Sequence, residues 1–448
     1  MHTDEDPRRP RFLPAILIAM FILRWWLGTL PGYPPDLRAY KYWALWGSTY
    51  GVHTLYDEDS IFDYPPLYGY LLAPIGHLET RLEPELAGRV LVPDDSGGPR
   101  DSIIFSMLVK IPPLIFDILL ALLLALLVRR GGLWARWRSW GGWAPALLFL
   151  LHPAILFISG YWGQPDCIET LFVMLALTLI LLRRPELGWI AAALGLLMKP
   201  LAAPFFPLLA LATLVTSGFR RLLTGGLAGI GTFLAGFLPF LLAGRGAQIT
   251  QRLLSDVDAM PFASVNGHNL WWLLAPWRPA SDPWLGPLTP KMIGLALFGI
   301  CYLGILWWIW TRRGPARTGG LGGQSPWYVA TAAVAVCFFT FSTHMHENHL
   351  YPALPFLMLM AGRDRRWAWI MGLVGLSLLV NMATHDLILG ELFLRDAGGA
   401  SGFFHPDFSR DLSRLEWGLA RGNALLTIGT CGALLVLMFR THPRRERE

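Results

Sequence analysis

Charge is scarce in this chain. Asp, Glu, Lys and Arg together make up 15% of its 448 residues, whereas 54% are hydrophobic, and the mean hydropathy is +0.44. This composition excludes an ordinary soluble domain and is typical of a polytopic membrane protein. Lysine is the rarest charged residue: 4 lysines stand against 33 arginines, a preference that a GC-rich genome produces, and it favours a bacterial origin.

Cysteine is scarce as well. The four cysteines fall within or at the edges of apolar runs, where a small polarizable side chain packs well: Cys167, Cys301, Cys337 and Cys431. Their spacing gives neither a disulfide framework nor a zinc motif. The first apolar run is too long for a signal-peptide core and lacks a small-residue cleavage site, so we expect it to remain as an anchor.

Apolar runs recur along the chain at the length of about 20 residues that a hydrocarbon core of roughly 30 Å requires. They lie at about 12–30, 103–128, 143–159, 167–182, 187–199, 201–217, 222–243, 292–311, 326–342, 350–362, 367–383 and 422–439, the fifth, sixth and tenth being short. The sequence therefore predicts an all-α polytopic membrane protein with about twelve transmembrane helices, forming a single integral-membrane domain over 1–448.

Arginines gather in every second connection between these runs, as at 129–130, 183–184, 220–221 and 312–313. Because short cytoplasmic loops hold the positive charge, this pattern places both termini in the cytoplasm. The same arginines account for the net charge of +6, so this charge does not indicate nucleic-acid binding. Since Arg184 and Arg220 lie on the same side, residues 187–217 either form a hairpin broken at Lys199-Pro200 or do not cross.

The long connections fall on the extracytoplasmic side, at 31–102, 244–290 and 384–421. The first carries Asp36 and the run DYPPLY at 63–68, and we expect short interfacial helices and a site within it. Pro65-Pro66 predicts a rigid entry into one such helix. The loop's aromatic residues either line an acceptor groove or form an interfacial belt: Trp43, Trp46, Tyr64 and Tyr68. Asp57-Glu58-Asp59 is either a solvated acidic stretch or a divalent-ion site.

Three cations are expected just beneath the outer interface: Arg24, Lys110 and Lys199. Each could snorkel or pair with an acid, but three at one depth favour a shared anion such as a lipid phosphate. Asp117 lies deeper and is expected to form a structural ion pair or hydrogen bond in the bundle.

The motifs resemble those of a known family in their order along the chain. They are Asp36, DYPPLYGY at 63–70, HPAILFISGYWGQPD at 152–166, MKP at 198–200, SVNGHNLWWL at 264–273 and THMHENHLYPALP at 343–355. This order resembles the GT-C glycosyltransferases, multi-spanning enzymes that take a sugar from a polyprenyl-phosphate donor. The likeness is greatest to the polyprenol-phosphate-mannose-dependent mannosyltransferases and the dolichyl-phosphate-glucose-dependent glucosyltransferases. A WWDYG-type signature, with its paired acids and soluble C-terminal domain, is missing, which disfavours transfer to protein.

The resemblance implies that Asp36 is the catalytic base that takes the proton of an acceptor hydroxyl. It implies cations for the leaving polyprenyl phosphate, for which the candidates are Arg24, Lys110, Lys199, His344 and His346. It also implies an inverting reaction, so that a beta-linked lipid donor gives an alpha product.

Further candidates for substrate contacts are Gln164, Asp166, Tyr64, Asn266, His268 and Glu347. Asp166 could instead cap a helix, and Asn266, His268 and Asn269 could be loop caps. Residues 344–349 read H-x-H-E-x-H, one residue short of the zincin spacing, and we expect no bound metal and no other cofactor.

The predicted function is transfer of a hexose, with mannose favoured, from a polyprenyl-phosphate-sugar donor to a lipid-linked glycan or glycolipid acceptor. The predicted location is a bacterial plasma membrane, with the active site on the extracytoplasmic face. The alternative is a multi-spanning transporter or flippase of a lipid-linked or anionic substrate, in which the intramembrane charges would serve coupling or binding. A third reading, an idle membrane scaffold, leaves Asp36 and the histidine cluster without a role.

Overall fold

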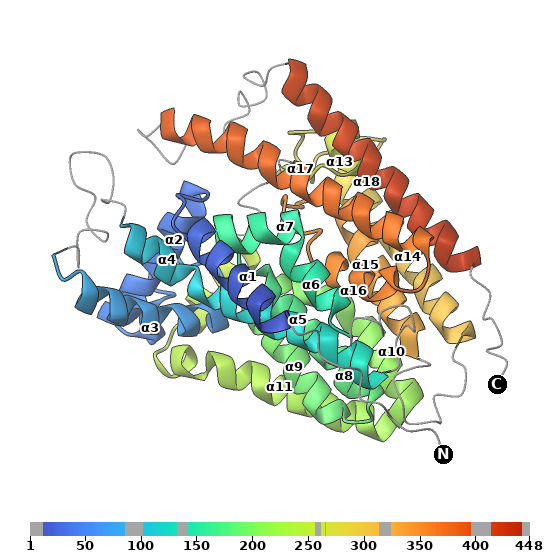
Figure 1. Ribbon diagram of the computed structural model, residues 1–448, viewed down its shortest axis with the longest axis horizontal. Helices are drawn as coiled ribbons and strands as arrows, with labels where there is room; N and C mark the ends of the chain where they lie inside the picture. The colour runs from blue at the N-terminus through green and yellow to red at the C-terminus, as the bar shows by residue number, and fades with distance from the viewer. Residues whose placement is uncertain are drawn as a thin grey trace.

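The computed structural model describes residues 12–85, 102–131, 142–255, 261–264, 266–312, 324–395 and 414–440 (Figure 1). This described part is 78% helix and holds no strand. Each predicted apolar run is helical, although the runs at 103–128, 143–159 and 201–217 are each divided between two or more helical elements. Among the described residues, six helices are long and apolar enough to cross a membrane, or seven if one bent pair counts as a single span. The all-α, membrane-spanning architecture is therefore consistent with the expectation, while a total of twelve crossings stays a prediction.

The first outer segment folds into two helices with a 3-10 turn between them, and α1 (Leu13–Gly28) precedes them. They are α2 (Pro34–Thr49), η1 (Val52–Thr54) and α3 (Pro66–Leu82), on the left of Figure 1; the short helix α4 (Ile103–Val109) lies beside them at the start of the next apolar run. Proline stands in the first turn of α2 and α3, where its fixed φ favours a helix start. The predicted entry at Pro65-Pro66 is confirmed.

Aromatic side chains hold these short helices together. The Trp43 ring lies 5.1 Å from the ring of Tyr64, and Tyr40 lies 5.2 Å from Tyr68. Trp43 and Tyr68 are buried. These two rings therefore form the core of the first outer segment and do not belong to an exposed interfacial belt.

The central bundle contains α5 (Ile111–Gly131), α6 (Ala144–Leu151), α7 (Pro153–Ile155), the π-helix η3 (Leu156–Trp162), α8 (Asp166–Leu181), α9 (Pro185–Met198), η4 (Pro200–Phe205), α10 (Phe206–Ser217) and α11 (Phe219–Leu242). The chain bends by 53° between α6 and the segment formed by α7 and η3. The predicted break at Lys199-Pro200 is present, between α9 and η4.

The remaining helices are α12 (Gly246–Ser255), α13 (Leu270–Leu274), α14 (Pro290–Thr311), α15 (Ser325–Phe341), α16 (Ala353–Ala361), α17 (Arg365–Arg395) and α18 (Arg414–Arg440). The last two pack side by side at the top right of Figure 1. The start of α12 is tied to the first outer segment because Arg245 pairs with Asp57 at 2.6 Å. An arginine thus neutralises Asp57 of the acidic stretch.

Two loops that are far apart in the sequence meet beside the short outer helices. Ser264 forms a parallel bridge with Met345, and the Gly267 amide donates to the Met345 carbonyl at 3.1 Å. A Cβ at Gly267 would lie 2.7 Å from that carbonyl oxygen, so only glycine permits this approach. The pairing positions residues 343–349 against residues 261–269.

Candidate functional site

Asp36 lies in the first turn of α2 and is the centre of a polar cluster. The Trp162 indole Nε1 donates to its Oδ2 at 2.7 Å, and the Gln164 amide donates to the same oxygen. The side chain is half-buried, and both of its hydrogen bonds within the described part of the chain end on Oδ2. Oδ1 is therefore the oxygen left to receive a proton or a ligand.

A chain of contacts continues from Asp36 through Gln164. The Lys199 ammonium donates to Gln164 Oε1 at 3.3 Å and to Asp166 Oδ1 at 3.0 Å. The Asn348 amide donates to Asp166 Oδ2 at 2.9 Å. The amide of Gln164 and both oxygens of Asp166 are thus occupied by protein partners. Asp166 takes part in this network and does not cap α8, whose N-cap residue is Pro165 without a side-chain bond.

Local sequence explains why these side chains converge. Lys199 precedes a proline, which disfavours the α conformation, and its extended backbone (φ −148°, ψ 142°) ends α9. Gly163 adopts φ +87° after the π-helix η3, which turns the chain between Trp162 and Gln164. A Cβ at Gly163 would meet the Lys110 side chain at 2.8 Å. The sharp turn thus requires glycine, and it directs the two Asp36 donors to one oxygen.

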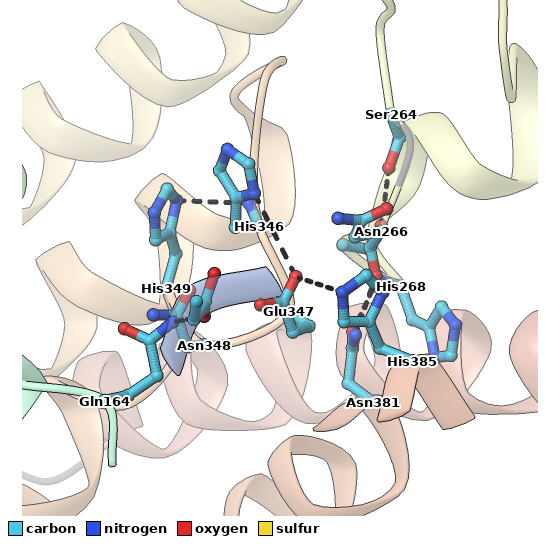
Figure 2. Close-up of polar contacts among 12 residues, drawn as sticks. Gln164, Ser264, Asn266, His268, His346, Glu347, Asn348, His349, Asn381 and His385 are labelled. Atoms are coloured by element: carbon cyan, nitrogen blue, oxygen red, sulfur yellow. Dashed lines mark hydrogen bonds and ion pairs between the residues drawn. The ribbon is translucent and has the colours of Figure 1, made fainter. Parts of the chain in front are cut away.

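Residues 344–349 form the second part of the site. Figure 2 shows Glu347 between two imidazoles: His346 Nδ1 lies 4.0 Å from its carboxylate, and His385 Nε2 lies 3.9 Å away. The backbone amide of His346 donates to His349 Nδ1 at 3.2 Å. Glu347 is buried, whereas His346 keeps 38% of its side chain exposed. His344 is half-buried and contacts the Thr343 hydroxyl at 3.0 Å.

The 266–269 segment is fixed against α17 and α18. Asn381 donates to the Asn266 carbonyl at 2.7 Å and accepts from the His268 amide at 2.6 Å, while Asn423 contacts His268 Nδ1 at 3.1 Å. Asn269 accepts from the first amides of α13, so it is the helix cap that the sequence left open. His268 is buried within this packing, and the two chain segments meet beside Glu347 (Figure 2).

The surroundings of Asp36 alter its proton affinity. Burial is the largest cause that raises the pKa of Asp36, from 3.8 to about 7. The hydrogen bond from Trp162 and the positive charge of Lys199 lower the pKa, whereas the negative charges of Glu347 and Asp63 raise it further. Burial also lowers the pKa of His346, which favours a neutral imidazole at pH 7. A carboxyl with a pKa near 7 is suited to general-base work at neutral pH.

Of the three cations expected beneath the outer interface, Lys199 joins this network through its hydrogen bonds to Gln164 and Asp166. Its ammonium also sits 5.3 Å from the centre of the half-buried Tyr64 ring. Arg24 instead pairs with Asp117 at 3.4 Å and donates to the Leu150 carbonyl at 2.6 Å. Lys110 donates to the Leu30 carbonyl at 2.8 Å and to that of Gly28 at 3.2 Å, at the C-terminal end of α1. The three cations therefore have separate partners, and the ion pair expected of Asp117 is present.

The structure adds residues to the site that sequence reasoning missed. Trp162 belongs to the motif at 152–166 and was not among the candidate site residues, yet it donates to Asp36. Asn348 and Asn381 fix the two loops, and His385 of α17 lies beside Glu347. Asn348 lies within the histidine-rich motif at 343–355, so the sequence indicated its place near the site. His385 is a single histidine on a long apolar helix, and no sequence pattern indicates it.

Among the described residues, no group of three or more His, Cys, Asp or Glu side chains could hold a metal ion. Comparison with protein-family models finds no match, and no curated protein matches the chain significantly.

Proposed function

We propose that this protein is an inverting glycosyltransferase of the GT-C type, with about twelve membrane spans. It moves a hexose, with mannose favoured, from a polyprenyl-phosphate donor to a lipid-linked glycan or glycolipid acceptor on the extracytoplasmic face of a bacterial plasma membrane. The observation that carries the proposal is the geometry of Asp36. One carboxylate oxygen is held by two donors and the other is left for substrate, in surroundings that raise its pKa to about 7.

In the proposed reaction Asp36 acts as the general base. As the acceptor oxygen attacks the sugar C1, its proton passes to Asp36 Oδ1. The bond from C1 to the phosphate oxygen breaks, and the electron pair leaves with the polyprenyl phosphate. Attack opposite the leaving group inverts the configuration at C1. Trp162 and Gln164 keep Oδ2 in place, so the carboxylate need not reorient during the proton transfer.

The leaving phosphate needs hydrogen-bond donors and positive charge on the side of Lys199. The ammonium of Lys199 is already oriented by Asp166 and Gln164, and His346 keeps an exposed imidazole in the same cluster. The carboxylate of Glu347 repels phosphate, so we place the sugar hydroxyls, and not the phosphate, beside it. Arg24 and Lys110 have structural partners and serve in this proposal to hold α1 in the bundle.

The experiment is transfer of radiolabelled mannose or glucose from a polyprenyl-phosphate donor to a total lipid extract by the detergent-purified protein. Label should enter a new lipid with the wild type and not with Asp36→Asn. Asp59→Asn, an exposed acid in the same outer segment, is the matched control and should retain activity. Full activity of Asp36→Asn would remove Asp36 as the base.

The transporter alternative rests on the many predicted spans and on the intramembrane charges of Arg24, Lys110 and Asp117. In the structure Arg24 pairs with Asp117, whose carboxylate also accepts from the hydroxyls of Ser159 and Tyr351, and such a contact is typical of a structural role. Lys110 donates to backbone carbonyls. A transporter would move a lipid-linked substrate in liposomes without forming a glycosidic bond. Substrate flux without label transfer would therefore favour that alternative.

A further inference from the structure

His385 is a buried residue of α17 that the proposed chemistry does not use. Its imidazole stacks on the Trp162 indole, with ring centres 5.5 Å apart and planes 12° apart. Tyr33 contacts both rings, at 4.5 Å from Trp162 and 4.9 Å from His385. Trp162 itself is fully buried. The indole is therefore held by an aromatic group from the start of α2 and by another from α17.

The edge of the same indole carries the hydrogen bond to Asp36. Trp162 Nε1 reaches Oδ2 at 2.7 Å, a short distance typical of a donor to a carboxylate. Such a bond depends on the orientation of the ring plane, because the indole has a single N–H in a fixed direction. Any side chain that fixes this plane also fixes the bond to Asp36.

His385 contacts a second group that acts on Asp36. Its Nε2 lies 3.9 Å from the Glu347 carboxylate, beside which Figure 2 shows it. The other groups that act electrostatically on Asp36 are Lys199 at the α9 end and Asp63 before α3, and Asp36 in turn acts on the tyrosines Tyr40, Tyr64 and Tyr68. Of these elements, α17 packs directly against α2, and its His385 contacts Tyr33 at the start of α2 as well as Trp162 and Glu347.

We propose that His385 is a positioning residue for Asp36: its ring holds the Trp162 indole in the plane that directs Nε1 to Oδ2, and so links α17 to the base. The expected effect of His385 on sugar transfer rests on the proposed function. The link itself is a property of the folded protein that can be measured without substrate.

The test is an infrared titration of the Asp36 carboxyl in the purified full-length protein, taken as the difference between each variant and the same variant carrying Asp36→Asn. In His385→Ala the indole loses its stacking partner and the hydrogen bond weakens. Because that bond stabilises the carboxylate, the titration midpoint should move to higher pH by about one unit. Trp162→Phe, which lacks the N–H, should give the same shift.

Two further variants separate stacking from a general loss of packing. His385→Phe keeps an aromatic ring and should leave the midpoint close to that of the wild type, whereas His385→Leu fills similar space without a ring and should shift it. The double variant of His385→Ala with Trp162→Phe should shift no further than either single variant. An unchanged midpoint in both His385→Ala and His385→Leu, or fully additive shifts in the double variant, would overturn the inference.

The two proposals fail separately. If Asp36→Asn retains transfer, the glycosyltransferase mechanism fails while the infrared titration still tests the link from His385. If Asp36→Asn is inactive but substitutions of His385 leave the titration midpoint of Asp36 unchanged, only the positioning role is lost. If both hold, the rate of His385→Ala should fall on the acid side of its pH profile and recover at high pH.

Discussion

Replacing Asp36 with Asn should make the folded protein more stable at pH 8 and leave its stability nearly unchanged at pH 4. Asparagine has nearly the same shape and keeps an oxygen that can accept from Trp162 and Gln164. The substitution therefore removes the charge while preserving the two contacts.

The magnitude follows from the pKa of Asp36, which rises from 3.8 to about 7 on folding. Near pH 4 the folded chain keeps the proton and the unfolded chain is close to its own midpoint, so the cost to the wild type is small, and it vanishes at lower pH, where both are protonated. Between pH 4 and 7 the unfolded chain releases the proton that the folded chain keeps, and stability falls as pH rises. Above pH 7 the full cost applies, and three pKa units correspond to about 4 kcal/mol.

The assay is unfolding of the detergent-purified wild type and the variant at pH 5, 6, 7 and 8, measured by one denaturant series at each pH. The stability difference in favour of Asp36→Asn should grow across this range. Asp59→Asn, at an exposed position of the same segment, should show no such growth. A difference for Asp36→Asn that stays constant from pH 5 to pH 8 would refute the reasoning that burial holds a proton on this carboxyl.

Four other substitutions and one treatment give further tests. Lys199→Met should weaken binding of the donor lipid by roughly 2 to 5 kcal/mol, measured by titration with polyprenyl phosphate, because the phosphate loses a desolvated cation. Adding Asp166→Asn to this variant should restore the stability of the fold but should not restore binding of the lipid. Glu347→Gln should move the acid limb of the transfer rate to lower pH, because its charge raises the pKa of Asp36; an upward move would contradict this. Asp117→Asn should destabilise the fold by about 3 to 5 kcal/mol, measured by unfolding, since its buried arginine partner is left unpaired, and should leave the pH profile unchanged. Transfer should survive EDTA, and loss that Mg²⁺ or Mn²⁺ restores would show a required metal.

Hydropathy predicted the apolar helices, because each one must turn apolar surface to lipid or to the core along its own length. Hydropathy did not locate α2, α3, α12 and α13, which lie outside the apolar runs. The break at Lys199-Pro200 was predictable from the local sequence, because a proline ends the preceding helix. The number of crossings was harder to predict. Helices such as α9 and α15 are shorter than a membrane requires, and apolar composition alone does not distinguish a span from a buried core helix.

The candidate site was predictable in its residue types but not in its pairings. Asp36 and Gln164 are 128 positions apart, and Asp166 and Asn348 are 182 apart, so no sequence pattern indicates these bonds. Local partners of the three cations were equally hard to predict, and the anion that they were expected to share stays a prediction. Lys110 donates to the Leu30 carbonyl, and Arg24 pairs with a carboxylate in the bundle.

The central claim is that Asp36 accepts the proton of an acceptor hydroxyl. We would first measure the initial rate of sugar transfer from polyprenyl-phosphate-mannose by the wild type from pH 5 to pH 9, with Asp36→Asn beside it. The structure predicts a rate that rises with pH through a midpoint near 7 and is absent in the variant. Transfer by the variant at the rate of the wild type, or a profile that is flat through pH 7 in the wild type, would contradict the claim.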